Sequence, residues 1–450
     1  MKQSNRNKVL VVKHIVRRAS RLISVACVLI TACAYGVTGL PGTLDTTWNG
    51  TGKVLTDIDG GTDQAAAMAL QSDGKLLLVG ECSGDFCAVR YLANGLLDTA
   101  WNGTGTVVTP IGGGMDSALS VAIQPDGMVL LAGGCDDGIK SSFCAARYLP
   151  GGTLDTTWNA TGMVITAIGS GSASATAMTL QPDGKVLLAG YCSIGNGPNR
   201  GFCAARYLPN GTLDTTWNGT GTVISAVGGS SDFATAMTLQ PDGNVLVAGY
   251  CAVGTGIDSD FCAVRYLPNG TLDTAWNGTG KVLSSVSGIA QAMTVQPDGK
   301  ALLAGRCTGN TNTDFCAARF LANGNLDITW NGNGTVVTPI GSDSDSARAV
   351  ILQSDGKVLL GGTCSSSFKD DFCAARYDGG PTEPKTCRPD VDGDESFLAT
   401  TDALIFMRVA LGITGSAVVS GITFPGSATR KTWPLIRDYL VTQCEMSLAP

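Results

Sequence analysis

Histidine is almost absent from this 450-residue chain: the single histidine is His14, and only 15% of the residues are charged. The rest of the chain has no imidazole, which excludes catalysis there by Ser-His-Asp or Cys-His groups. It also excludes metal sites built from histidines. Low charge combined with 60 glycines is typical of close-packed strands joined by tight turns. The formal net charge of −7 and the lack of a basic patch predict that nucleic acid is not a partner.

Long apolar runs are also missing, apart from an uncharged stretch from Leu22 to Tyr35. Seven basic residues and no acidic residue precede this stretch, which is too short for a comfortable membrane span. We therefore expect residues 1–34 to be a signal peptide, and the protein to be secreted or held at the surface of a bacterium. The sequence around Cys33 resembles a bacterial lipoprotein box, so lipidation of Cys33 is an alternative to cleavage at Ala34, and an uncleaved anchor helix is a third possibility. After cleavage we expect no membrane span.

What the chain does contain is a sixfold repeat. Six copies of L-D-x-x-W-N-[GA] are separated by steps of 53, 57, 59, 59 and 54 residues. The phrases Q-[PS]-D-G and F-C-A-[AV]-R each occur six times as well. The tryptophans of the first phrase are Trp48, Trp101, Trp158, Trp217, Trp276 and Trp330. A fixed period of this length indicates one supersecondary unit repeated along the chain.

Each repeat predicts four short strands. In residues 97–149 they fall near Gly105–Ile111, Ala118–Ile123, Met128–Gly133 and Phe143–Leu149, separated by Asn-Gly, Gly-Gly-Gly and Pro-Asp-Gly turns and by one variable polar loop. Four strands in about 56 residues match one blade of a β-propeller. A β-solenoid is the alternative, although its coils are usually shorter.

The phrases G-G-x-x-D-x-A-x-A-[MV]-x-[LI]-Q-[PS]-D-G-K and R-Y-x-x-[ND]-G-x-L-D-x-x-[FW] resemble the delta-60 repeat family. The resemblance covers residues 44–378 and implies a β-propeller without implying an activity. Tryptophan in place of the usual phenylalanine, and a cysteine pair in each repeat, set this chain apart. We predict an all-β fold with a six-bladed propeller over residues 41–378, in which Lys53–Ile58 completes the last blade and leaves no open edge.

Cysteines divide into groups. Two lie in the signal, at Cys27 and Cys33, and two bracket the C-terminal segment, at Cys387 and Cys444. The other twelve form one pair per repeat, and an even count in an exported chain predicts disulfides. The expected pairs are Cys82 with Cys87, Cys135 with Cys144, Cys192 with Cys203, Cys251 with Cys262, Cys307 with Cys316, Cys364 with Cys373, and Cys387 with Cys444. Zinc binding is the alternative, but the spacing within pairs varies and no C-x-x-C motif is present.

We expect the other recurring residues to stabilise the repeats and not to bind a ligand. We expect the six tryptophans to fill the gaps between blades. The arginine of F-C-A-x-R, such as Arg147, should form an ion pair with a repeat aspartate such as Asp98 or Asp155. A ring of six arginines around an anion is the alternative.

After Tyr377 the repeats stop, and residues 379–386 read as a linker. Residues 387–450 look like a dockerin-type, EF-hand-like module, which implies a small helical domain that binds one Ca²⁺. The implied ligands are Asp390, Asp392, Asp394, the carbonyl of Ser396 and Asp402. The module departs from the pattern at Glu395 and in the late position of Asp402, and its second half offers only Asp438. A solvated acidic turn without metal is the alternative.

These features favour an exported, non-enzymatic and monomeric binding or scaffold protein. Its protein or glycan ligand would contact the rim formed by the loops between paired cysteines, such as Ser193–Gly201 and Ala252–Asp260. The alternatives are a polysaccharide-degrading enzyme and a surface-layer protein. Catalytic carboxylates are scarce, since beyond the signal the glutamates are Glu81, Glu383, Glu395 and Glu445. Candidates among the aspartates that do not recur in every repeat include Asp136, Asp137, Asp258 and Asp370, which lie in loops.

Overall fold

The computed structural model describes residues 44–442, except 196, 230, 254–258, 309–311, 367–368, 380–389, 394–397, 399, 412, 414 and 427. The expected signal segment lies outside the described residues, and so do Cys387, Cys444, Asp394 and Ser396. No helix among the described residues is long and apolar enough to cross a lipid bilayer.

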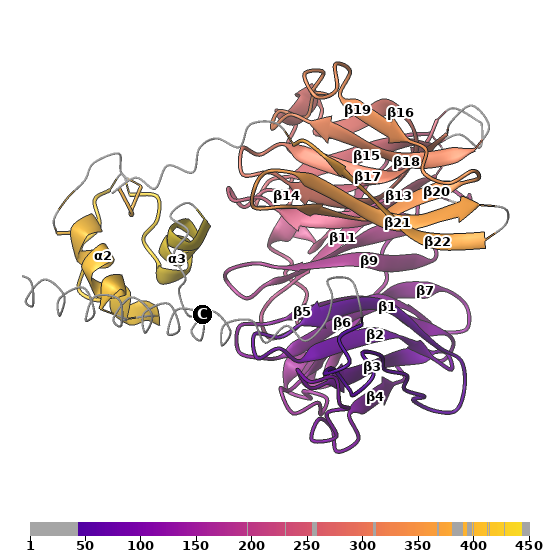
Figure 1. Ribbon diagram of the computed structural model, residues 1–450, viewed down its shortest axis with the longest axis horizontal. Coiled ribbons are helices and arrows are strands. Elements are labelled where there is room, and N and C mark those ends of the chain that lie inside the picture. The colour runs from indigo at the N-terminus through magenta and orange to yellow at the C-terminus, as the bar shows by residue number, and fades with distance from the viewer. Residues whose placement is uncertain are drawn as a thin grey trace, which may run out of the picture. The chain divides into compact units, whose positions relative to one another are not determined.

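The repeats form antiparallel meanders that follow one another along the chain (Figure 1). The first three sheets are β1 (Asp63–Leu70), β2 (Leu76–Cys82), β3 (Asp85–Tyr91) and β4 (Thr106–Thr109); β5 (Asp116–Ile123), β6 (Val129–Asp136), β7 (Ser141–Tyr148) and β8 (Met163–Thr166); and β9 (Ala173–Leu180), β10 (Val186–Ser193), β11 (Arg200–Tyr207) and β12 (Thr222–Ser225). The next sheet has seven strands, β13 (Asp232–Leu239), β14 (Val245–Ala252), β15 (Ser259–Tyr266), β16 (Lys281–Val295), β17 (Ala301–Thr308), β18 (Thr313–Phe320) and β19 (Thr335–Thr338). The last sheet is β20 (Asp345–Leu352), β21 (Val358–Ser366) and β22 (Lys369–Tyr377).

From Trp101 onward, the strand that follows each tryptophan pairs with the third strand of the preceding repeat, as β4 pairs with β3. The seven-stranded sheet joins two repeats because β16 is continuous, ending one meander and beginning the next. The second strand of a repeat is buried on both faces, which explains its unbroken apolar sequence, Val-Leu-Leu-Ala in β6.

Turn chemistry accounts for the recurring asparagines and glycines. Asn102 adopts a φ of +52° and Gly103 a φ of +78°, the left-handed conformation that asparagine and glycine tolerate best. The Asn102 side-chain amide donates a hydrogen bond to the carbonyl of Thr106 at 3.0 Å and closes the turn. Within the sheet, a β-bulge in β5 brings the carbonyl of Ser117 within 1.9 Å of where a Cβ on Gly133 would lie. Only glycine fits there.

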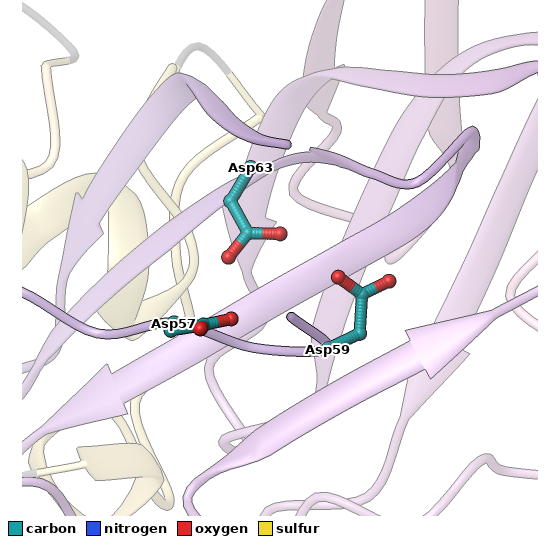
Figure 2. A group of neighbouring side chains, drawn as sticks. All are labelled: Asp57, Asp59 and Asp63. Carbon is teal, nitrogen blue, oxygen red and sulfur yellow. The ribbon is translucent and has the colours of Figure 1, made fainter. Parts of the chain in front are cut away.

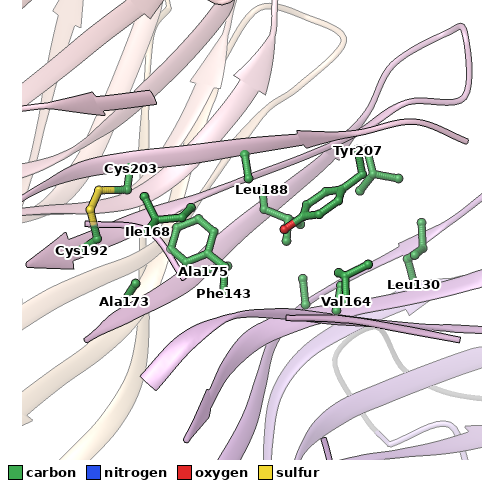
Figure 3. Packing of buried hydrophobic residues seen from close by; sticks show 14 of the residues in the cluster. Leu130, Phe143, Val164, Ile168, Ala173, Ala175, Leu188, Cys192, Cys203 and Tyr207 are labelled. Carbon is green, nitrogen blue, oxygen red and sulfur yellow. A yellow bond between two sulfur atoms is a disulfide. The ribbon is translucent and has the colours of Figure 1, made fainter. Parts of the chain in front are cut away.

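The hydrophobic core lies between successive sheets, where each cluster mixes residues of two repeats. Figure 3 shows one of them, in which Leu130 and Phe143 of one repeat pack with Val164, Leu188 and Tyr207. Trp158 belongs to the same cluster and is fully buried. The five tryptophans from Trp101 to Trp330 are at most 5% exposed, so they fill the space between repeats as expected.

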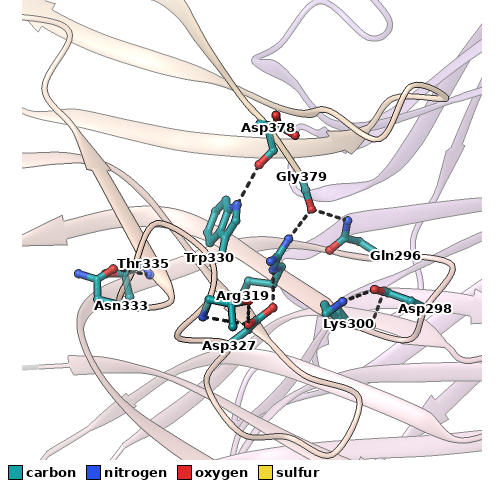
Figure 4. A network of polar contacts seen from close by, with 11 residues as sticks. Gln296, Asp298, Lys300, Arg319, Asp327, Trp330, Asn333, Thr335, Asp378 and Gly379 are labelled. Atoms are coloured by element: carbon teal, nitrogen blue, oxygen red, sulfur yellow. Dashed lines mark hydrogen bonds and ion pairs between the residues drawn. The ribbon is translucent and has the colours of Figure 1, made fainter. Parts of the chain in front are cut away.

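An arginine that pairs with an aspartate of its own repeat also connects that repeat to the next one. Arg147 donates to the Asp155 carboxylate at 2.8 Å within its own repeat, and to the carbonyl of Pro209 at 2.9 Å in the following one. Arg90, Arg206, Arg265 and Arg319 make the same two contacts. Figure 4 shows the version built on Arg319, Asp327 and the Gly379 carbonyl. The expected pairing is confirmed at these five arginines, whose charges are already neutralised, so they form no anion-binding ring.

The last sheet differs from the others. It has three strands, and Lys53–Ile58, the expected fourth strand, is not in a strand in the structure. Phe372 of β22 is fully exposed, whereas the corresponding phenylalanines of the other repeats are buried. In the other repeats the outer strand pairs with a segment roughly 20 residues upstream, but Lys53–Ile58 would have to reach one roughly 300 residues away, at a higher loop-closure entropy.

Residues 44–56 and 91–96 form a small unit of their own. The ring of Trp48 lies 6.4 Å from that of Tyr91, and the Asn49 amide donates to the Asn94 carbonyl at 2.6 Å. A hydrogen bond of 2.7 Å between the hydroxyls of Thr56 and Tyr91 completes it.

Helix is scarce among the described residues. The turns after three tryptophans contain short 3-10 segments, η1 (Trp158–Ala160), η2 (Trp217–Gly219) and η3 (Trp276–Gly278). The C-terminal segment contains α2 (Asp402–Ala410), η4 (Gly415–Val418) and α3 (Trp433–Thr442). These helices share a small core of their own, built from Val391, Ile405, Val409, Val418, Trp433, Ile436 and Leu440.

Replacing Asp155 by asparagine should destabilise the fold by about 3 kcal/mol, because it leaves the guanidinium of Arg147, whose side chain is only 12% exposed, without its anion. Burial alone would raise the pKa of Asp155, but hydrogen bonds from Thr157 and Arg147 outweigh it and hold the pKa below its ordinary value of 3.8. The stability from this pair is therefore complete above that value and is lost as the pH falls through the lowered pKa.

Urea unfolding of the variant at pH 7 and pH 3 measures both effects. The matched control is Asp183→Asn, which breaks the pair with Lys185 at a half-exposed aspartate and should cost less than about 1 kcal/mol. Equal losses in the two variants would contradict a special role for the buried pair.

Candidate functional site

Six disulfides, one per repeat, define the end of the molecule that we consider as a binding surface. Each links the second and third strands of a repeat, with Cα atoms 5.6–5.9 Å apart. The pairing expected within the repeats is confirmed, since the bridges join Cys82 to Cys87, Cys135 to Cys144, Cys192 to Cys203, Cys251 to Cys262, Cys307 to Cys316 and Cys364 to Cys373. In the third repeat, Cys192 lies opposite Gly201 and Cys203 opposite Gly190, so the bridge crosses the hairpin diagonally close to its loop.

The hairpins closed by these bridges differ while their strands stay the same. The cysteines are 5 residues apart in the first repeat and 11 apart in the third and fourth. The first hairpin is a tight turn at Ser83 and Gly84, both with positive φ. The second holds Asp137, which accepts hydrogen bonds from the backbone amides of Ile139 and Lys140 at 2.9 and 2.8 Å. A rigid base with a variable tip is typical of binding loops.

Carboxylates recur at the same end, between neighbouring repeats. Asp116 is fully buried and accepts backbone hydrogen bonds from Ile111 and Gly112 at 2.7 and 2.8 Å. Asp345 holds Ile340 and Gly341 in the same way, at 2.7 and 3.0 Å. Their role is to close the loop that leads into the first strand.

A second aspartate faces each of these two. Burial, and then the charge of Asp116, raises the pKa of Asp85. Burial and the charge of Asp345 likewise raise the pKa of Asp314. A carboxyl group with a raised pKa can serve as a general acid. Here, however, the pair recurs at two repeat boundaries and each inner aspartate is occupied with backbone amides, which indicates a structural role.

The aspartates that do not recur serve the loops. The Asp136 carboxylate accepts hydrogen bonds from the Gly138 amide at 2.7 Å and the Ser141 hydroxyl at 3.0 Å. Asp370 accepts one from the Ser365 hydroxyl and lines an open hollow of about 470 Å³ together with Asp343 and Ser344. Asp258 lies outside the described residues.

An acidic group that sequence reasoning missed lies at the start of β1. Figure 2 shows Asp57, Asp59 and Asp63, each of which offers a carboxylate oxygen within 4.8 Å of the others. The amides of Gly60, Gly61 and Ile58 donate to these three carboxylates. The alternating spacing in Asp-Ile-Asp-Gly-Gly-Thr-Asp was the signal available for it. By itself this group is a hydrogen-bonded turn.

The C-terminal acidic loop brings three of its predicted ligands together. Asp390, Asp392 and Asp402 each offer a carboxylate oxygen within 4.8 Å of the others, and Asp392 and Asp402 are buried. Asp402, the first residue of α2, accepts hydrogen bonds from the amides of Val391, Asp392 and Leu398 at 2.6, 3.0 and 2.9 Å. This carboxylate therefore gathers the loop around the start of the helix.

Arg430 braces the same loop from the other side. Its guanidinium donates to the carbonyls of Val391 and Asp390 at 2.8 and 2.9 Å, and it lies 4.0 Å from the ring centre of Tyr439. A Cβ on Gly393 would come within 2.2 Å of the Thr429 hydroxyl oxygen. The loop is thus shaped by protein contacts, and a fixed positive charge lies near the carboxylates.

Comparisons with known proteins agree with the repeat architecture. Residues 71–100, 124–157, 181–216, 240–275 and 296–329 match the model of a family described as a beta-propeller domain of unknown function (DUF5122). The chain is a β-propeller repeat protein. No curated protein matches this propeller chain.

Several solved structures are similar to the propeller at low identity. The polysaccharide lyase PL25-Ulvanlyase is 8% identical over 69% of this chain and 78% of its own, with a TM-score of 0.39. The polysaccharide lyase Uly1 is 12% identical over 77% of this chain and 86% of its own, with a TM-score of 0.38. An α-L-arabinofuranosidase from Fusarium graminearum is 11% identical over 69% of this chain and 91% of its own, with a TM-score of 0.41. At these values the likenesses say nothing about the function of this propeller.

Replacing Asp314 by asparagine should raise the melting temperature of the propeller at pH 7 by a few degrees. The raised pKa means that the folded state holds a proton more tightly than the unfolded state, so stability falls as the pH rises through the ordinary value of 3.8 toward the raised pKa. The asparagine variant should lose that part of the pH dependence. Calorimetric melting between pH 3 and pH 7 measures it.

Asp260→Asn is the matched control, since it occupies the same strand position but the next repeat carries Gly288 where Asp345 lies. It should not raise the melting temperature. A fall in stability for Asp314→Asn would show that the carboxylate is needed in its charged form.

Proposed function

We propose that this protein is an exported, non-enzymatic binding protein whose propeller repeats present disulfide-anchored hairpin loops to a protein or glycan ligand. The observation that carries the proposal is the contrast between constant strands and variable hairpins. A disulfide closes each hairpin of the six repeats near its loop, yet the separation of the cysteines ranges from 5 to 11 residues. Anchoring reduces the conformational entropy that a loop loses on binding.

The cysteine chemistry supports export. All twelve cysteines of the repeats are in disulfides, which persist in oxidising compartments and are rare in the cytosol. We extend the proposal to secretion or display on a bacterial surface, with residues 1–34 as the signal and Cys33 as a possible lipidation site.

We further propose that the C-terminal segment is a dockerin-like module that binds one Ca²⁺. Three carboxylate oxygens within 4.8 Å of one another are the donor set that a hard cation prefers. Asp390, Asp392 and Asp402 would hold the ion, joined by Asp394 and the carbonyl of Ser396. The hydrogen bonds to Asp402 and the charge of Arg430 compete with the ion, so the expected affinity is modest.

Calorimetric titration of Ca²⁺ into the full chain tests the module. We expect one site that is lost in Asp392→Asn and kept in Asp59→Asn, because the second variant changes the acidic group at the start of β1. The melting temperature of both variants in excess EDTA shows that they are folded. Loss of the site in Asp59→Asn alone would assign the ion to the propeller and overturn the proposal for the C-terminal segment.

A panel of extracellular polysaccharides and surface proteins tests the binding function. Residues 194–199, the hairpin loop between β10 and β11, would be exchanged for the Ser-Gly turn of the first repeat. We expect at least a tenfold loss of affinity for the ligand at an unchanged melting temperature. The control exchanges the turn between β9 and β10 for that of the first repeat, which amounts to the single substitution Pro182→Ser.

The same incubations distinguish binding from catalysis. Release of shortened or unsaturated sugar products, abolished by Asp370→Asn in the open hollow, would replace the binding function with the polysaccharide-degrading one. Affinity that both exchanges leave unchanged would show that the ligand does not contact the hairpins.

A further inference from the structure

Three aromatic rings and Arg200 gather on the strands of the third and fourth repeats, and the charge of Arg306 acts on one of these rings, Tyr250. We call Tyr191, Arg200, Phe233, Tyr250 and Arg306 the aromatic–arginine stripe; they come from β10, β11, β13, β14 and β17. The ring of Phe233 is stacked on Tyr250 at 5.0 Å and meets the edge of Tyr191 at the same distance. The Arg200 guanidinium lies 5.0 Å from the ring centres of both Tyr191 and Phe233.

The fold does not require these residues. Tyr191, Tyr250 and Arg306 precede the first cysteine of the third, fourth and fifth repeats. The same position holds Glu81, Gly134 and Thr363 in the other three. Phe233 corresponds to Ser117, Ser174 and Ser346 in the second, third and sixth repeats. The other repeats form the same strands without aromatic residues or arginines at these positions. Packing alone therefore does not explain the stripe.

Polar groups of the stripe lack partners in the described part of the chain. The tyrosines that recur in the repeats donate to a hydroxyl, as Tyr148 does to Thr109 at 2.7 Å. Among the described residues, the hydroxyls of Tyr191 and Tyr250 make no hydrogen bond. Arg200 and Arg306 likewise have no carboxylate within ion-pair distance there, unlike the five arginines that join the repeats.

The stripe is partly exposed and carries two arginines. All five side chains are neither fully buried nor fully exposed. Burial raises the pKa of Tyr250, and the nearby Tyr191 adds to this, so the hydroxyl stays protonated at neutral pH and can donate. Two guanidinium groups that have no carboxylate partner among the described residues can pair with an anion.

We propose that the aromatic–arginine stripe binds an acidic polysaccharide. The aromatic rings provide flat apolar surface for the C–H faces of the sugar, and the tyrosine hydroxyls can hydrogen-bond to sugar hydroxyls. Arg200 and Arg306 pair with the carboxylate or sulfate groups through charge-assisted hydrogen bonds. This proposal rests on the proposed binding function and names the class of ligand.

Affinity measurements with the full chain test it, using polygalacturonate, dextran sulfate, neutral dextran and polyglutamate at about 0.15 M ionic strength. We expect binding to at least one of the two acidic polysaccharides, which tells carboxylate from sulfate, and none to dextran. Arg200→Gln, Arg306→Gln and Tyr250→Ser should each weaken it about tenfold or more. The control Lys369→Gln removes an exposed cation on β22 and should change affinity less than about twofold.

The outcomes separate this proposal from the general binding function. Equal binding of polyglutamate would show a site for acidic protein, and no binding of either acidic polysaccharide would also overturn the proposal. A polysaccharide that binds with unchanged affinity to all three stripe variants, but not to the protein with the exchanged 194–199 hairpin, would place the site on the hairpin instead. In that case the proposed binding function stands and the stripe is structural. Melting temperatures show that each variant is folded.

Discussion

The buried arginine–aspartate pair is the interaction on which the repeat architecture depends. A guanidinium at Arg147 has one planar set of donors, and it uses them in two directions at once: toward Asp155 in its own repeat and toward the Pro209 carbonyl in the next. It also lies 5.6 Å from the ring centre of Trp158, which fills the gap between the same two repeats. Charge, hydrogen bonding and packing therefore specify a single way for neighbouring repeats to meet.

Local backbone geometry keeps that arrangement the same from repeat to repeat. The bulge in the first strand and the glycine opposite it, Ser117 and Gly133 in the second repeat, allow two strands to approach more closely than a side chain would permit. The disulfide then crosslinks the second and third strands close to the hairpin, as Cys135 and Cys144 do in the same repeat. On the strand side of the disulfide, sequence variation would disturb the core. On the loop side, the hairpin can change in length and composition without destabilising the sheet. Variation for binding is thus confined to one end of each repeat.

The aromatic–arginine stripe is a second kind of variation, which lies on the strands next to the disulfides and not in the hairpins. At a position where other repeats carry glycine, threonine or glutamate, three consecutive repeats carry Tyr191, Tyr250 and Arg306. A side chain here faces the neighbouring repeat rather than its own core, so neighbouring substitutions add to one continuous surface. In contrast, the arginines that hold the repeats together are neutralised by their aspartates and are not available to a ligand.

The sequence by itself determined the repeat, its strands and turns, the pairing of the cysteines within the repeats, and a repeat aspartate as the partner of Arg147, because each depends on contacts that are close along the chain. It also pointed to Asp390, Asp392 and Asp402, since alternating acids before a helix converge locally. Only the tertiary structure decided what depends on packing between repeats. It brought Tyr191 against Phe233 from different sheets, placed Arg147 against Pro209, and set Arg430 beside the acidic loop. It also left Lys53–Ile58 outside any strand, because pairing with a distant strand is not encoded by local pattern.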